Sequence, residues 1–160
     1  MSESRSEPVV WIAGVGAVAG LGAALARRFA REGLLVAVSG RSPDKLQAVV
    51  EGIRALGGDA VAIVADSGVE SEVIAASQQI SQLGPLKAAI FNVGNSVAAP
   101  TLELSAQLFE QTWRASTLGG FLFAREATRL LLDSGGGSLL FTGARPGTRA
   151  ARSRRYPRRR

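Results

Sequence analysis

The chain has no cysteine and no histidine among its 160 residues. Without cysteine it can form no disulfide and has no thiol nucleophile. Without histidine it lacks the commonest metal ligand and the base of a serine–histidine–aspartate triad. We therefore expect no metal site, and any chemistry must rest on hydroxyls, carboxylates, cations and glycines. The absence of cysteine is compatible with a cytoplasmic location, which we expect.

Acidic side chains are missing from one stretch, residues 145–160, which contains eight arginines. The formal net charge of +6 comes from that stretch, because residues 1–144 hold 11 basic and 13 acidic side chains. With almost no apolar residues, residues 145–160 are predicted to be a disordered tail that could bind nucleic acid or another polyanion. We expect residues 1–8 to be a disordered leader and residues 9–144 to form one domain.

Glycine is abundant, and four of the 19 glycines lie in the stretch Val9–Gly22, VVWIAGVGAVAGLG. An apolar run of strand character ends in these glycines, and a helical pattern follows at once. Such a turn directs free N–H groups and the helix dipole at one point, where they bind an anion such as pyrophosphate. The uncharged run Val9–Ala26 could also be a membrane helix, but it is rich in Ala and Gly, and the leader before it is acidic.

Further apolar runs alternate with helical patterns of ten or more residues. They predict strands at residues 34–38, 60–65, 86–91 and 138–141, in addition to the strand that begins at Val9. Strands that alternate with helices indicate βαβ units and a parallel sheet covered on both faces. The expected fold class is therefore α/β, a Rossmann-like doubly wound sheet in three layers, with about five strands in the order 3-2-1-4-5.

Local signals predict how the helices begin and which faces they bury. Leu21, Leu25 and Phe29 recur every four residues and predict the buried face of the first helix. Ser42 and Ser105 are expected to be N-caps, because a serine hydroxyl accepts a hydrogen bond from a free N–H group of the first turn. From Ser105 the helical pattern continues through residue 132.

The glycine spacing resembles that of a known family. Gly16, Gly20 and Gly22 form G-x-x-x-G-x-G, which is similar to the T-G-x-x-x-G-x-G of short-chain dehydrogenases/reductases, with Val15 in place of the threonine. The resemblance implies an NAD(P)-dependent oxidoreductase that moves hydride to or from a small alcohol or carbonyl substrate.

Three further landmarks support this resemblance. Arg41 follows the second strand where NAD-preferring members usually carry an acid, so it could pair with the 2′-phosphate of NADP, or be a solvated arginine in a turn. Asp66 resembles the family's adenine-binding aspartate, and could also cap the next helix. Asn92-Val93-Gly94 resembles the end of the family's N-N-A-G, although a plain turn is an alternative. The expected NADP-binding residues are Gly16, Gly20, Leu21, Gly22, Arg41, Asp66, Asn92 and Gly94.

The catalytic part of the resemblance is incomplete. Ser116 stands where the family has an asparagine, and Gly143 where it has a serine that binds the substrate oxygen; the neighbouring Thr142 is expected to face the other way. Tyr156 and Arg160 have the spacing of the family's Tyr-x-x-x-Lys. However, Pro157 follows the tyrosine directly, and arginine is a poor proton relay. We therefore expect no catalytic residue in this chain.

Three functional hypotheses follow. The first is an oxidoreductase of this family, inactive in a truncated form. The second is a catalytically silent NADP-binding module, and the third is a polyanion binder that acts through residues 145–160. The abrupt change of composition after Gly143 is typical of GC-rich DNA translated in a shifted frame.

Overall fold

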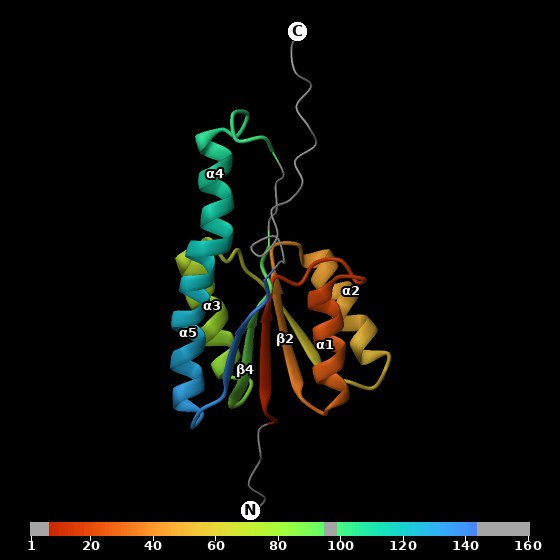
Figure 1. The fold of residues 1–160 in the computed structure, drawn as a ribbon. Helices are drawn as coiled ribbons and strands as arrows, with labels where there is room; N and C mark the ends of the chain where they lie inside the picture. Colours follow the sequence, from red (N-terminus) through yellow and green to blue (C-terminus); the bar gives the residue numbers. More distant parts are fainter. Residues whose placement is uncertain (1–6, 95–98, 144–160) are drawn as a thin grey trace, which may run out of the picture.

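Five parallel strands form one sheet in the order β3-β2-β1-β4-β5, which confirms the predicted order (Figure 1). The computed structural model describes residues 7–94 and 99–143. The strands are β1 (Val9–Ala13), β2 (Leu35–Gly40), β3 (Ala60–Val64), β4 (Leu86–Phe91) and β5 (Ser138–Phe141). The chain starts at the centre of the sheet, builds outward to β3, then returns to the other side of β1.

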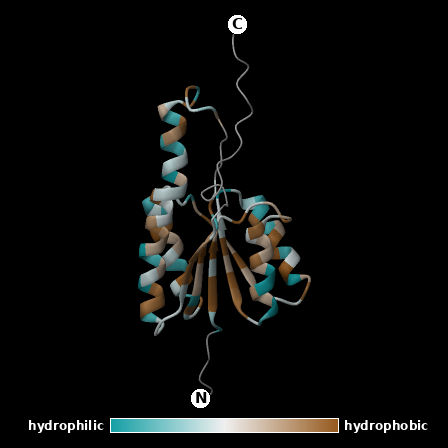
Figure 2. Ribbon diagram, viewed as in Figure 1, coloured by the Kyte–Doolittle hydropathy of each residue, from teal (hydrophilic) through white to brown (hydrophobic). Residues whose placement is uncertain are grey.

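Helices cover both faces of the sheet, as the alternating pattern predicted. Figure 1 shows α1 and α2 on one side of the sheet, and α3 and α5 on the other. The helices are α1 (Leu21–Arg31), α2 (Pro43–Arg54), α3 (Glu70–Ser81), α4 (Ala106–Trp113), the π-helix η1 (Arg114–Leu118) and α5 (Gly119–Asp133). Two apolar clusters result, one on each face, and Figure 2 shows the most apolar residues on the strands between them.

The central strand β1 divides its side chains between these two clusters. Val10 and Ile12 join the cluster under α1 and α2, whereas Val9, Trp11 and Ala13 join the cluster under α3 and α5. Because successive side chains of a strand point to opposite faces, a strand covered on both faces is apolar throughout. This explains the unbroken apolar run that opens the domain.

The buried face of α1 differs from the prediction. Leu21 is 58% exposed, and Leu25 and Phe29 are only partly buried. The buried residues of the helix are Gly22, Ala23, Ala26 and Ala30. Small side chains let the helix backbone lie close to the sheet, while Leu25 and Phe29 pack against the margin of the cluster under α1 and α2 and Leu21 is exposed.

The two predicted N-caps have different outcomes. Ser105 caps α4, and its Oγ accepts a hydrogen bond from Leu108 N at 3.1 Å. Ser42 occupies the N-cap position of α2, but its side chain makes no capping bond there. The hydroxyl of Ser42 therefore remains available to the space in front of α2.

The helical segment after Ser105 is divided by η1, where the sequence pattern suggested one continuous helix. At the junction, a Cβ on Gly119 would lie 3.0 Å from both the carbonyl oxygen and the Oγ of Ser67. The loop after β3 therefore packs directly against the helix backbone. A π-helical turn inserts an extra residue per turn and changes the helix face, and such turns are common at functional sites.

One carboxylate is buried within α5 and is paired there. Glu126 is 5% exposed and binds Arg125 at 2.8 Å and Arg129 at 3.1 Å. Arg125 also reaches Glu70 of α3 at 2.7 Å, and these two carboxylates raise the pKa of the Arg125 guanidinium. The pairs compensate the buried charge and tie α5 to α3.

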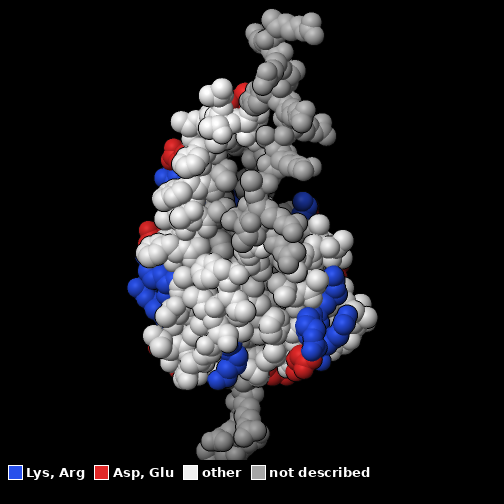
Figure 3. All heavy atoms as spheres, viewed as in Figure 1, with Lys and Arg blue, Asp and Glu red and all other residues white. Residues whose placement is uncertain are grey.

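Charged side chains lie mainly on the helical flanks, and the face in front of β5 is almost free of them in the view of Figure 3. None of the helices in the described ranges is long and apolar enough to cross a membrane.

Candidate functional site

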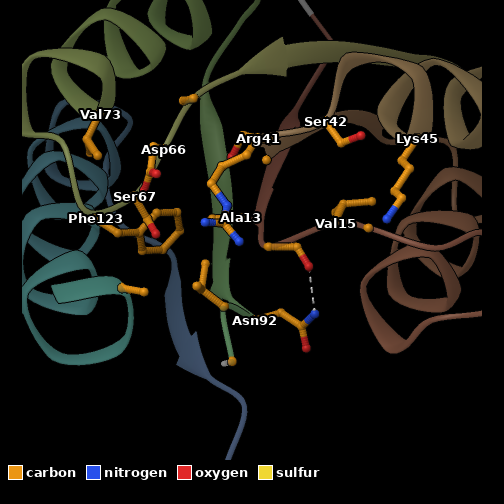
Figure 4. Close-up of a pocket in the computed structure, with 18 of the residues that line it drawn as sticks. Ala13, Val15, Arg41, Ser42, Lys45, Asp66, Ser67, Val73, Asn92 and Phe123 are labelled. Atoms are coloured by element: carbon orange, nitrogen blue, oxygen red, sulfur yellow. Dashed lines mark hydrogen bonds between the residues drawn. The ribbon is translucent and has the colours of Figure 1, made fainter. Parts of the chain in front are cut away.

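A cavity of about 620 Å³ opens at the carboxyl ends of the central strands. It lies between the loops that follow β1, β2, β3 and β4, where the chain order reverses across the sheet (Figure 4). In open parallel sheets ligands bind at this switch point, because the two outgoing loops diverge and leave a crevice.

Five of the eight residues expected at the cofactor line this cavity: Gly16, Arg41, Asp66, Asn92 and Gly94. The other three are not part of its lining. Gly20 is the N-cap of α1, Gly22 is buried in the first turn, and the Leu21 side chain is exposed at the surface. The sequence pattern thus located the loop, but it did not separate glycines that face the cavity from those that support it.

The glycines of the first loop have different structural roles. Gly14 has a φ of +82°, and a Cβ there would lie 2.5 Å from Val93 N, so only glycine fits without a shift. Gly16 has no atom within 4 Å of its Cβ position and leaves open space on the cavity side. Gly22 brings α1 within 3.1 Å of the Gly14 carbonyl oxygen, measured from its Cβ position. Gly14 belongs to the site, and its place at the end of the apolar run was the signal.

The end of β2 has no room for a side chain. A Cβ on Gly40 would lie 2.7 Å from the Val15 carbonyl oxygen. Arg41 follows immediately and extends into the cavity in Figure 4. Ser42 and Lys45 line the same wall, at the N-terminal turn of α2, and were not identified from the sequence. Their spacing of three residues places them on one side of a helix start, a signal that was available.

Asp66 lies in the turn after β3 and faces the cavity together with Ser67 (Figure 4). Its Oδ1 accepts a hydrogen bond from Gly68 N at 2.9 Å, while its own N–H donates to Glu72 Oε2 at 2.7 Å. The N-cap of α3 is Val69, so the expectation that Asp66 caps this helix is wrong. The aspartate instead stabilises the turn formed by residues 66–68, which precedes the helix.

Trp11 also lines the cavity and was not predicted from the sequence. Its Nε1 donates to Ser39 Oγ at 2.9 Å, and its ring centroid lies 4.4 Å from that of Phe123. Trp11 is 1% exposed, so the bond satisfies a buried donor and fixes the position of the indole at the cavity. A tryptophan in an otherwise aliphatic strand was the available signal.

Asn92 joins the loops after β1 and β4. Its Nδ2 donates to the Gly14 carbonyl oxygen at 3.1 Å, shown by the dashed line in Figure 4, and its N–H donates to Ala13 O at 2.9 Å. The side chain therefore fixes the glycine loop relative to β4, which is more than a plain turn requires.

The residues considered for catalysis are not brought to the cavity. Ser116 lies in η1, and Gly143 follows β5 with none of the described atoms within 4 Å of its Cβ position; neither residue lines the cavity. Tyr156, Arg160 and the tail 145–160 lie outside the described residues, as does most of the leader. Within the described parts, no cluster of acidic side chains could hold a metal ion.

The residues that line the cavity fit a dinucleotide. An open glycine loop precedes the N-terminus of α1, where backbone N–H groups bind phosphate. Arg41 and Lys45 supply positive charge, and Asp66 supplies an acceptor. The cavity volume lies in the range usual for cofactor sites.

Comparison with known proteins gives consistent results. The short chain dehydrogenase family matches residues 10–154. Elsinochrome reductase 1 of Elsinoe fawcettii is 33% identical over 90% of this chain and 54% of its own length. Glucose 1-dehydrogenase of Gluconobacter oxydans is 34% identical over 75% of this chain and 46% of its own.

A solved short-chain dehydrogenase from Rhodopseudomonas palustris superposes with a TM-score of 0.83 at 37% identity, covering 90% of this chain and 67% of that protein. The chain spans about half the length of the curated relatives it matches. The family match covers most of the chain, and the structure has the dinucleotide-binding sheet with its cavity at the switch point. The chain therefore belongs to the short-chain dehydrogenase/reductase family.

Proposed function

We propose that this chain binds NADP(H) in the cavity, as the cofactor-binding part of an oxidoreductase for a small alcohol or carbonyl substrate. The family implies an NAD(P) cofactor, and the observation that carries the choice of NADP is Arg41. This guanidinium faces the cavity directly after β2, where a carboxylate would favour NAD. The names of the two relatives, a reductase and a dehydrogenase, are consistent with hydride transfer.

The packing at Gly40 supports the same choice. Because its Cβ position lies 2.7 Å from Val15 O, a carboxylate at this strand end would require the glycine loop to move. The ribose would instead lie beside Arg41. Lys45 and the Ser42 hydroxyl, which makes no capping hydrogen bond, are next to it. An arginine and a lysine favour a phosphate over a hydroxyl group by charge-assisted hydrogen bonds.

The remaining residues would hold the other parts of the cofactor. The glycine loop and the N-terminus of α1 would bind the pyrophosphate. Asp66 would accept a hydrogen bond from the adenine amino group, as the family resemblance implies. Asn92 and Gly94 would contact the cofactor near the end of β4. When bound, NADP(H) supplies or accepts the hydride, and the residues of this chain orient it.

We further propose that the chain binds the cofactor without turnover. The observation that favours this silent module is Gly143, which has no hydroxyl for a substrate oxygen, together with Ser116, which is shorter than the asparagine of the family. A catalytic set must hold its groups within about 0.5 Å of productive geometry. Arg41 and Asp66 serve binding, not proton transfer.

Calorimetric titration with NADPH and NADH tests the choice of cofactor. We expect NADPH to bind at least about tenfold more tightly than NADH, and Arg41→Ala to remove most of this difference, since a charge-assisted bond contributes about 1.5–3 kcal/mol. Arg54→Ala is the matched control, because Arg54, at the C-terminal end of α2, donates to Ala60 O of β3 and does not line the cavity. Equal affinities in the unmutated protein would contradict the proposal.

The same preparation tests the absence of turnover. The full chain is incubated with NADP(H) and a panel of alcohols and carbonyls, and absorbance at the nicotinamide band is followed. We expect no turnover. Turnover that Tyr156→Phe abolishes would show that residues after 143 complete an active site.

A further inference from the structure

Thr142 lies just beyond β5 and forms a hydrogen-bonded connection to the glycine loop. Its Oγ1 is 3.0 Å from Asn92 Oδ1 and 3.4 Å from Phe91 O. A hydroxyl has one hydrogen, and the shorter contact is the better bond. The backbone N–H of Thr142 donates to Phe91 O at 3.0 Å, which fixes the residue as a continuation of the β4–β5 ladder.

The direction of donation along this connection is determined by its last member. The Gly14 carbonyl oxygen can only accept, so the amide nitrogen of Asn92 must face it, at 3.1 Å. The amide oxygen then faces Thr142, which must donate. The Gly14 carbonyl thus selects this orientation of the Asn92 amide, and the Thr142 hydroxyl adds a second hydrogen bond that holds the amide in it.

The carbonyl of Gly14 is at the centre of the site. The Cβ positions of two glycines show how tightly this region is packed: that of Gly22 lies 3.0 Å from Asn92 Nδ2, and that of Gly14 lies 2.7 Å from Asn92 O. The end of β1, the first turn of α1 and the loop after β4 thus leave no space for an added methyl group without a shift. A reoriented Asn92 amide would place an oxygen against the Gly14 oxygen and push these backbones apart.

We propose that Thr142 is a positioning residue of the cofactor site, acting through the Asn92 amide on the glycine loop. Thr142 does not line the cavity, whereas Asn92 and Gly14 do. Its effect on the cofactor must therefore pass through Asn92. The inference rests on the proposed binding of NADP(H), and its test distinguishes the two.

The variants Thr142→Val and Thr142→Ser separate the hydroxyl from the shape of the side chain. Valine keeps the volume and removes the donor, and serine keeps the donor. We expect Thr142→Val to raise the NADPH dissociation constant of the full chain about three- to tenfold by calorimetry, the range for one hydrogen bond. Thr142→Ser should remain within about twofold of the unmutated protein.

A double-mutant cycle with Asn92→Ala tests the route. If Thr142 acts through Asn92, Thr142→Val should have no further effect on NADPH affinity when Asn92 is already alanine. Additive losses would overturn the proposal, as would equal weakening by valine and serine. A lower melting temperature in Thr142→Val with an unchanged dissociation constant would reduce Thr142 to a structural role and also overturn it.

Nuclear magnetic resonance of the free protein provides a readout that needs no cofactor. The chain has two asparagines, so the Asn92 carboxamide signals are assigned by their loss in Asn92→Ala. We expect these signals to shift in Thr142→Val and not in Thr142→Ser; unchanged signals in the valine variant would overturn the inference. If the unmutated protein binds no NADPH, the proposed function fails, and the carboxamide signals alone decide the role of Thr142.

Discussion

Strands β1 and β5 are both largely apolar, yet they differ in burial. Every residue of β1 is buried, whereas Ser138, Leu140 and Phe141 of β5 are exposed and Leu139 is only partly covered. The reason is position: β1 pairs on both sides and has helices over both faces, and β5 pairs only with β4 among the described strands. The centre of the sheet, which bears the cofactor cavity, is thus more fully packed than the edge that leads to Gly143.

Some glycines show a similar contrast, between the loops at the cavity and the end of β5. At the centre, the Cβ positions of Gly14 and Gly40 lie within 2.7 Å of backbone atoms. At the end of β5, no atom of the described residues lies within 4 Å of the Cβ position of Gly143, whereas that of Gly137, just before the strand, lies 2.5 Å from Lys87 O. Neighbouring backbone therefore holds the loops at the centre, whereas the described residues give Gly143 no such contact. Three pairs of substitutions test this difference between centre and edge.

The largest expected effect is at the aromatic cluster beneath the cavity. Phe123→Ala should reduce the free energy of unfolding by about 3–5 kcal/mol, because the ring is 1% exposed and packs against Trp11. Phe141→Ala, at the edge and 54% exposed, should cost less than about 1 kcal/mol. Urea denaturation of both variants measures the difference. Similar losses would mean that the edge is as well packed as the centre.

A smaller effect is expected at the first glycine of the loop. Gly14→Ala should destabilise the protein by about 2–4 kcal/mol, since a left-handed φ costs about 1–2 kcal/mol for other residues and the Cβ meets fixed backbone. Gly16→Ala is the matched control, because its Cβ position is open; we expect nearly normal unfolding and weaker NADPH binding. If both variants unfold at the same urea concentration, the assignment of Gly14 as the constrained residue is wrong.

The smallest effect on stability is expected at the edge itself. Leu140→Lys should change the free energy of unfolding by no more than about 0.5 kcal/mol, since Leu140 is 47% exposed. It should, however, reduce self-association, because a charge on an edge strand opposes pairing with another chain. Light scattering against concentration measures this. Leu132→Lys on α5, where the leucine is 70% exposed, is the control and should not change it.

The sequence predicted more of the fold than of the site. Strand order followed from alternating periods and right-handed crossovers, and the structure confirms it. The glycine loop and the ends of β2, β3 and β4 were also found, because each is marked by a change from apolar residues to turn residues. Trp11, Ser42 and Lys45 were missed: each has a local signal, but only the pairing of β1 with β2, which leads into α2, brings them to one cavity, and Ser42 was expected to serve as a cap that does not form.

The chain's own pattern of apolar and turn residues thus determined the parallel sheet, its strand order and the glycine turn before α1, because periodicity and glycine are local properties. Only the tertiary structure decided which face of α1 is buried, where η1 divides the long helix, and that Gly40 leaves no room for an acid. It also decided that Thr142 reaches Asn92 across 50 residues. Each of these depends on how closely one backbone approaches another, and that distance is set by the packing of distant segments and not by the residues of either segment alone.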